Sequence, residues 1–203
     1  NKSIASKTDI LILDDDGNVR FRGNNDQINN YITFEGDLFS IIGAFKVANS
    51  LDGTPEWRYK IIKAGTQGQI YMNNNQMPYQ NSPAYSSLYQ TKYALSNYVD
   101  NAVWNVGTLD NPDVSLSQGY DKEKKAKWTG KIGILSPSDY AYASLNNNGI
   151  NYNTNLGNNW LWLGSQEWTM IPYYGTSYWM YGYDQKSGNT NGSNYNYRPV
   201  VYL

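Results

Sequence analysis

Two short apolar runs joined by a polar turn lie near the start of the chain. Residues 10–13 are apolar, residues 14–18 read Asp-Asp-Asp-Gly-Asn, and residues 19–22 alternate between apolar and basic side chains. Turn residues between two such runs are typical of a β-hairpin. We therefore predict a hairpin across residues 10–22.

A longer extended segment follows this hairpin. Residues 38–47 are apolar on both faces of an extended chain, which is the pattern of a central strand. Residues 31–34 precede it across a tight turn at residues 35–37. Residues 57–63 follow a second turn, and we expect them to pair back against the central strand.

Helical spacing appears in two later segments. Residues 87–104 carry an apolar stripe that predicts one helix or a broken pair; it consists of Leu88, Leu95, Val99, Ala102 and Val103. Residues 136–139, Ser-Pro-Ser-Asp, supply an N-cap, a proline at the first helical position and an acid at the third, so a short helix begins there. The charge run at residues 122–127 is interpreted as a solvated connection.

The last third, from Gly149 onward, reads as loops rich in Asn, Gly and aromatic residues. Period-two alternation returns at residues 179–183 and 195–203, which predicts a terminal hairpin. There is no internal repeat and no linker. We predict one mixed α+β domain over residues 1–203, with residues 1–23 as a candidate satellite hairpin.

Composition excludes several classes of chemistry. The 203 residues include no His and no Cys, which removes Cys/His and Ser/His/Asp nucleophile systems, thiolate or imidazole zinc sites and haem held by His. We expect no metal and no cofactor. A net charge of -1 lacks the basic field that nucleic-acid binding needs. No apolar stretch reaches the roughly 18 residues of a membrane span.

The chain is rich in aromatic and amide side chains and poor in charged ones. It holds 20 Tyr and 7 Trp but only 16% charged residues, below the roughly 25% of an average domain. Tyr, Asn, Ser and Gly are the side chains of adaptable recognition surfaces, which favours a secreted surface protein. AT-rich codons are an alternative explanation for the Asn excess. Asn1 begins no signal peptide, so we interpret the chain as a trimmed extracellular segment.

Eight segments in fixed order carry a resemblance to a known family. They include Trp-Thr-Gly-Lys-Ile-Gly-Ile-Leu-Ser-Pro-Ser-Asp-Tyr at residues 128–140 and Tyr-Arg-Pro-Val-Val-Tyr-Leu at residues 197–203; the others are residues 14–21, 30–34, 39–45, 59–63, 104–107 and 167–170. The chain resembles an uncharacterised domain of Gram-positive surface proteins, often attached to a prepilin-type N-terminus or another anchor. That family is similar to C-type-lectin-like and formylglycine-generating-enzyme-like folds.

The resemblance implies a scaffold and a location, and no reaction. It implies a C-type-lectin-like fold, mainly an antiparallel sheet with two flanking helices, in which the first and last strands pair. Residues 149–177 would be the long loop region used for recognition. The chain departs from the family at Phe39-Ser40, where Trp-Arg is usual, and it lacks a Cys that members often carry. Formylglycine chemistry and the lectin calcium motifs are likewise absent.

Acidic residues offer two candidate sites. Asp14, Asp16 and Asn18 resemble a calcium loop, but no bidentate Glu closes the pattern, so a hairpin turn is favoured. Paired carboxylates could hydrolyse glycosides, and the four glutamates are Glu35, Glu56, Glu123 and Glu167. Glu167, beside Trp168, is the one acid in an aromatic setting, and we expect capping or a hydrogen bond to backbone there.

Aromatic residues near the C-terminus are the candidate binding site. Trp160, Trp162 and Trp168 lie in apolar stretches and are interpreted as core, and the family resemblance implies a structural role for Trp104 and Trp128. The recognition set is Tyr173, Tyr174, Tyr178, Trp179, Tyr181 and Tyr183. Flat rings can stack on sugars or anchor a protein partner. The alternative is that alternate rings of this set face the core.

Three functions follow from these observations. The first is a non-enzymatic adhesin or binding module, displayed on a pilus or cell surface, that recognises a host or environmental glycan or protein. The second is a structural minor pilin or pilus-tip subunit whose partners are sister subunits. The third is a hydrolase that uses carboxylates alone.

Overall fold

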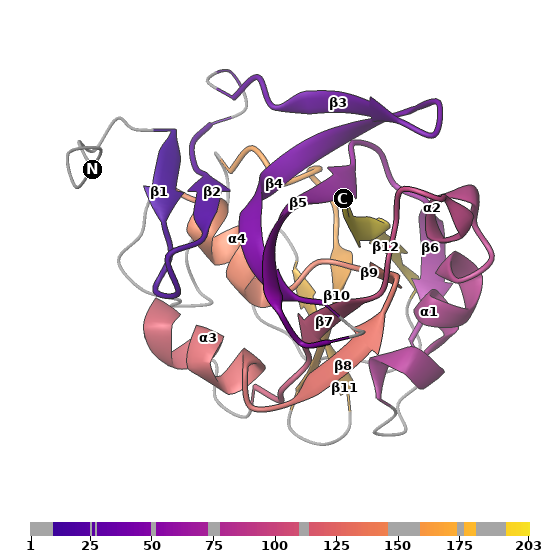
Figure 1. Cartoon of the computed structure of the whole chain (residues 1–203). Helices are drawn as coiled ribbons and strands as arrows, with labels where there is room; N and C mark the ends of the chain where they lie inside the picture. Colours follow the sequence, from indigo (N-terminus) through magenta and orange to yellow (C-terminus); the bar gives the residue numbers. More distant parts are fainter. Residues whose placement is uncertain are drawn as a thin grey trace.

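The computed structural model describes residues 10–24, 26, 28–49, 52–72, 78–109, 114–145, 159–173, 177–181 and 194–203. For residues 173 and 177–181 it describes the backbone. Within these ranges the fold is mixed α+β, with mostly antiparallel sheets and four α-helices (Figure 1). The predicted α+β class is confirmed.

A seven-stranded sheet forms the centre of the molecule. Its order is β1-β2-β4-β5-β13-β9, and β3 also pairs with β4. The strands are β1 (Leu11–Leu13), β2 (Val19–Phe21), β3 (Tyr31–Phe34), β4 (Asp37–Ala48), β5 (Pro55–Lys63), β9 (Ile132–Gly133) and β13 (Val200–Tyr202). The predicted first hairpin, the central strand and its return strand are all confirmed. Glu35 and Gly36 turn the chain between β3 and β4 with φ of 49° and 79°.

Two smaller sheets complete the strand structure. One has the order β11-β10-β12-β6, and the other pairs β7 with β8. Their strands are β6 (Gly68–Tyr71), β7 (Ala102–Asn105), β8 (Lys127–Gly130), β10 (Glu167–Tyr173), β11 (Ser177–Tyr181) and β12 (Asn194–Tyr197). The predicted terminal hairpin is wrong, because β11 pairs with β10, β12 pairs with β6 and β10, and β13 enters the central sheet.

Short helices flank the sheets on two sides. They are the 3-10 turn η1 (Tyr79–Asn81) and the helices α1 (Pro83–Leu88), α2 (Lys92–Leu95), α3 (Leu116–Glu123) and α4 (Pro137–Ala143). Figure 1 shows α3 and α4 beside the β1–β2 hairpin and α1 and α2 on the opposite side. The helix predicted after Ser136 is confirmed, whereas the stripe at residues 87–104 ends in strand β7. No helix of the described residues is long and apolar enough to cross a membrane.

Three details implied by the family resemblance differ in the structure. The last strand, β13, lies between β5 and β9, and it does not pair with β1, the first strand of the described residues. The part of the chain that the structure describes forms four α-helices, whereas two were expected. Residues 149–177 contain the seven-residue strand β10 and so are not a continuous loop.

Tryptophan side chains organise the core. Trp104 is buried, donates its indole N–H to the Gly130 carbonyl at 2.8 Å and packs on the Tyr202 ring at 4.7 Å. Trp168 is fully buried and donates to the Ile70 carbonyl at 2.7 Å. Trp128, Trp160 and Trp162 are half-buried against the same core. The structural role predicted for these five residues is confirmed.

Candidate functional site

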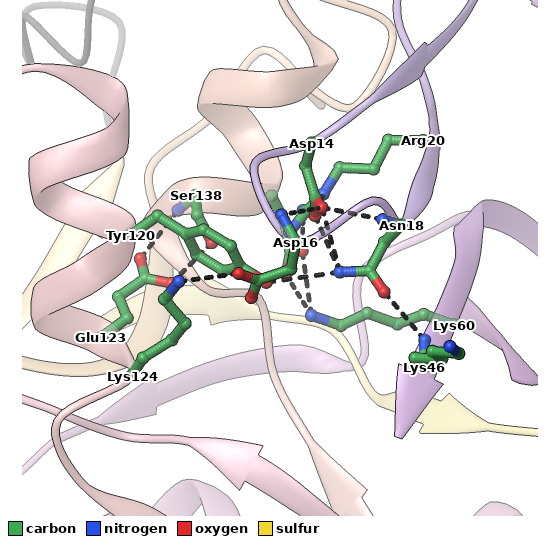
Figure 2. A network of polar contacts seen from close by, with 11 residues as sticks. Asp14, Asp16, Asn18, Arg20, Lys46, Lys60, Tyr120, Glu123, Lys124 and Ser138 are labelled. Atoms are coloured by element: carbon green, nitrogen blue, oxygen red, sulfur yellow. Dashed lines mark hydrogen bonds and ion pairs between the residues drawn. The ribbon is translucent and has the colours of Figure 1, made fainter. Parts of the chain in front are cut away.

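The Asp14 carboxylate belongs to a network of buried charged side chains next to the first hairpin. It accepts hydrogen bonds from the Asp16 N–H at 3.0 Å, from the Asn18 N–H at 2.9 Å and from Arg20 Nε at 2.6 Å (Figure 2). The predicted hairpin turn is therefore confirmed. Asp14 is, however, only 6% exposed as a whole residue, and its side chain belongs to the interior.

Arg20 reaches the interior because β2 approaches β4 very closely. It lies opposite Gly43, where a Cβ atom would lie 2.1 Å from the Val19 carbonyl oxygen. The Arg20 guanidinium lies 4.6 Å from the Phe45 ring and 4.4 Å from the Tyr142 ring. Burial opposes its charge, but the nearby carboxylates outweigh that cost and raise the pKa of Arg20.

Lys60 and Asp139 join two distant segments inside the protein. Lys60 Nζ, on β5, lies 2.9 Å from Asp139 Oδ1 and 2.7 Å from Oδ2. Asp139, the third residue of α4, also accepts a hydrogen bond from the Ser136 N–H at 2.9 Å and from Arg20 at 3.1 Å. Burial disfavours the ammonium, yet attraction to Asp139 prevails and raises the pKa of Lys60.

Glu123 connects α3 to the start of α4. Its carboxyl group accepts hydrogen bonds from the Ser138 N–H at 2.9 Å and from the Ser138 hydroxyl at 2.6 Å (Figure 2). The residue is 1% exposed, and burial raises its pKa to about 7. The interpretation of residues 122–127 as a solvated connection is confirmed for the exposed residues 125–127 but wrong for Glu123. Helix α3 turns Glu123 inward, while Lys124 reaches outward to Asp16.

A cavity of about 30 Å³ lies among these groups. Its lining includes Arg20, Lys60, Glu123, Ser138 and Asp139, with aromatic walls from Phe45, Trp104, Tyr120 and Tyr202. This volume holds about one or two water molecules. Ligand sites usually occupy about 300–1,000 Å³, so the cluster is far too small to admit a substrate.

A second buried ion pair contacts α4 through Tyr140, the residue that follows Asp139. Arg198 donates to Glu167 through Nε at 2.6 Å and through Nη2 at 2.8 Å. The Tyr140 hydroxyl also donates to Glu167, and Arg198 donates to the Leu161 carbonyl at 2.7 Å. Glu167 was expected to cap or to bond backbone, but its partners are side chains from α4 and from the segment between β12 and β13.

All four glutamates have identified partners in the structure. Glu35 accepts a hydrogen bond from the Ser96 hydroxyl at 2.6 Å, and Glu56 pairs with Arg58. Glu123 and Glu167 are 1% exposed. A pair of carboxylates acting on a sugar needs a face open to substrate, so these partners do not favour a hydrolase built on the glutamates.

Apolar side chains gather on the solvent face of the central sheet. Leu11 and Leu13 of β1 are 38% and 67% exposed, and Trp57 and Tyr59 of β5 are 55% and 58% exposed. Strand pairing places them on one face, because Leu13 opposes Val19, Val19 opposes Ala44, and Ala44 opposes Tyr59. We call the surface formed by Leu11, Leu13, Lys46, Trp57 and Tyr59 the outer sheet face.

The structure describes only part of the six aromatic residues that were predicted to form the recognition site. Tyr173 ends β10, while Tyr178, Trp179 and Tyr181 lie in β11. The side chains of these four, and the whole of Tyr174 and Tyr183, lie outside the described residues. Their role in binding stays a prediction.

Sequence reasoning missed both the charge cluster and the outer sheet face. A usable signal was present in residues 57–63, where Trp57 and Tyr59 alternate with the basic residues Arg58 and Lys60. Period two puts the aromatic and the basic side chains on opposite faces. The unexpected result is that the basic face is the buried one.

Comparisons with family models, with curated proteins and with solved structures each found no match for this chain. Function is therefore inferred from the sequence and from the geometry of the structure.

Proposed function

We propose that this chain is a non-enzymatic extracellular binding module that recognises a macromolecular partner. The outer sheet face carries this proposal. Two aromatic and two leucine side chains, each more than a third exposed, lie on one surface of four paired strands. Contiguous exposed apolar surface of this kind is typical of interaction sites.

The chemistry of the outer sheet face favours a protein over a glycan. Trp and Tyr are the residues that most often anchor protein interfaces, and the neighbouring strand positions are Leu, Val and Ala. Lys46, whose Nζ lies 5.9 Å from the Trp57 ring, is the charged member of the set. A sugar site needs several hydrogen-bonding groups among its rings, and this face offers few.

The surface location rests on the family resemblance and on a composition rich in amides and phenols. The C-type-lectin-like assignment is a proposal on the same grounds. A structural pilus subunit is the second candidate, and one observation favours it. The apolar face continues to β1 at the edge of the central sheet, where a sister subunit could contact Leu11 and Leu13.

The test is a binding assay with surface variants of the full chain. We would measure sedimentation velocity over a wide concentration range and screen the same protein on a glycan array. The variant Trp57→Ala/Tyr59→Ala removes the two anchors, and Tyr98→Ala, 76% exposed elsewhere, is the matched control.

Self-association lost in the double variant and kept in the control would support protein recognition through the outer sheet face. A glycan signal lost in the same way would support the module and reassign its ligand class. Any binding that survives Trp57→Ala/Tyr59→Ala would contradict the assignment of this face, and Tyr173→Ala would then test the C-terminal aromatic residues.

A further inference from the structure

We propose that Lys60 and Asp139 form an intramolecular amide cross-link by condensation of their side chains. Lys60 Nζ contacts both carboxylate oxygens of Asp139, at 2.9 and 2.7 Å. An amine that touches both oxygens also lies close to the carbon between them. Reacting atoms about 3–3.5 Å apart are typical of a near-attack arrangement.

The surroundings favour condensation over hydrolysis. Lys60 is 4% exposed and Asp139 is 1% exposed, so bulk water is excluded. Lys60 Nζ lies 5.4 Å from the Phe45 ring and 5.8 Å from the Trp104 and Tyr202 rings. Burial disfavours the charges of both side chains, and their conversion to a neutral amide removes that desolvation cost.

The reaction balances without an outside reagent. The Lys60 ammonium passes one proton to the Asp139 carboxylate, and its neutral nitrogen attacks Cγ to form the new C–N bond. The nitrogen then releases a second proton to the Asp139 oxygen that received the first, and this oxygen, now carrying both protons, leaves as water when its C–O bond breaks. One ammonium and one carboxylate give one amide and one water, with no oxidation or reduction.

Two neighbouring side chains and the cavity can each assist one step of this reaction. Arg20 donates to Asp139 Oδ1 at 3.1 Å, where it stabilises negative charge on the tetrahedral intermediate. Glu123 lines the same cavity and, with a pKa of about 7, can give and take a proton near neutral pH. The cavity has room for the water that is released.

Intact-mass spectrometry of the full chain tests the proposal. We expect a mass lower than the sequence mass by one water molecule. Trypsin should fail to cut after Lys60, and tandem spectra should show a branched peptide that joins Lys60 to Asp139. Lys60→Arg keeps the positive charge but lacks a lysine amine, so this variant should have its full sequence mass.

Two controls keep the result specific. Lys63→Arg, on the same strand, should retain the water loss. Asp16-Gly17 and Asp52-Gly53 can also lose water as succinimides, but mild base reopens those rings and leaves a side-chain amide intact.

A folded Glu123→Gln chain should cross-link more slowly, and an unchanged rate would show that Glu123 takes no part in the reaction. A full-mass wild-type chain, or water loss mapped to an Asp-Gly pair, overturns the cross-link.

Discussion

Glu123 makes the stability of the protein depend on pH through a single carboxyl group. Burial raises its pKa from 4.5 to about 7, so between these values the unfolded chain loses the proton while the folded protein keeps it. The free energy of unfolding should therefore fall by on the order of 3 kcal/mol as pH rises through this window. Above the window it should level off. Glu123→Gln, uncharged at every pH, should flatten this slope in urea unfolding.

A matched variant on the same helix isolates this effect. Asp121 is 68% exposed and pairs with Lys124 at 3.0 Å. Asp121→Asn should leave the slope between these pH values unchanged, since exposed pairs contribute about 0–1 kcal/mol. Equal slopes in the wild type and in Glu123→Gln would show that the buried carboxyl group does not titrate in this range.

At the scale of elements, the contact between β2 and β4 positions the first hairpin. A methyl group at Gly43 would lie 2.1 Å from the Val19 carbonyl oxygen and 3.0 Å from the Arg20 Cα atom, both backbone atoms. Gly43→Ala should therefore separate the strands, displace Arg20 from Asp139, and lower the free energy of unfolding by at least about 1–3 kcal/mol. Chemical denaturation measures the loss.

Gly65→Ala is the control for this substitution, because no atom lies within 4 Å of its Cβ position. Its free energy of unfolding should stay near that of the wild type. If both alanine variants lost the same stability, the loss at Gly43 would not be specific to the β2–β4 contact, since the lower entropy of the unfolded chain favours folding in both variants.

Sequence patterns predicted an element correctly where its hydrophobic spacing or its capping residues agree with the way it packs in the fold. The continuous apolar run of β4 and the Ser136-Pro137 start of α4 both formed as expected. Helix α2 (Lys92–Leu95) lies within the stripe predicted at residues 87–104, but the prediction is wrong at its end, where Ala102 and Trp104 fit a strand period as well as a helix period. Pairing with β8 decided the matter, and sequence spacing does not show that contact.

The charge cluster was less predictable than the fold for a related reason. Asp14 and Glu123 sit in sequence among other charged residues, which is the usual pattern of a solvated turn or helix. Their burial depends on partners far along the chain; Arg20 and Asp139, for example, are separated by 119 positions in sequence. Neither the composition nor the periodicity of the sequence indicates which residues pair over such a separation.

At the scale of the whole molecule, the buried pair of Arg198 and Glu167 joins the small sheet to α4 and the central sheet. Arg198 lies between β12 and β13, Glu167 begins β10, and Tyr140 belongs to α4. Arg198→Met leaves Glu167 buried without its cation, so thermal and urea unfolding should show a loss of about 3–5 kcal/mol. Because that loss comes from the stranded carboxylate, adding Glu167→Gln should recover part of it. No recovery in the double variant would mean that Arg198 stabilises the junction through its packing and its bond to the Leu161 carbonyl, and not through charge.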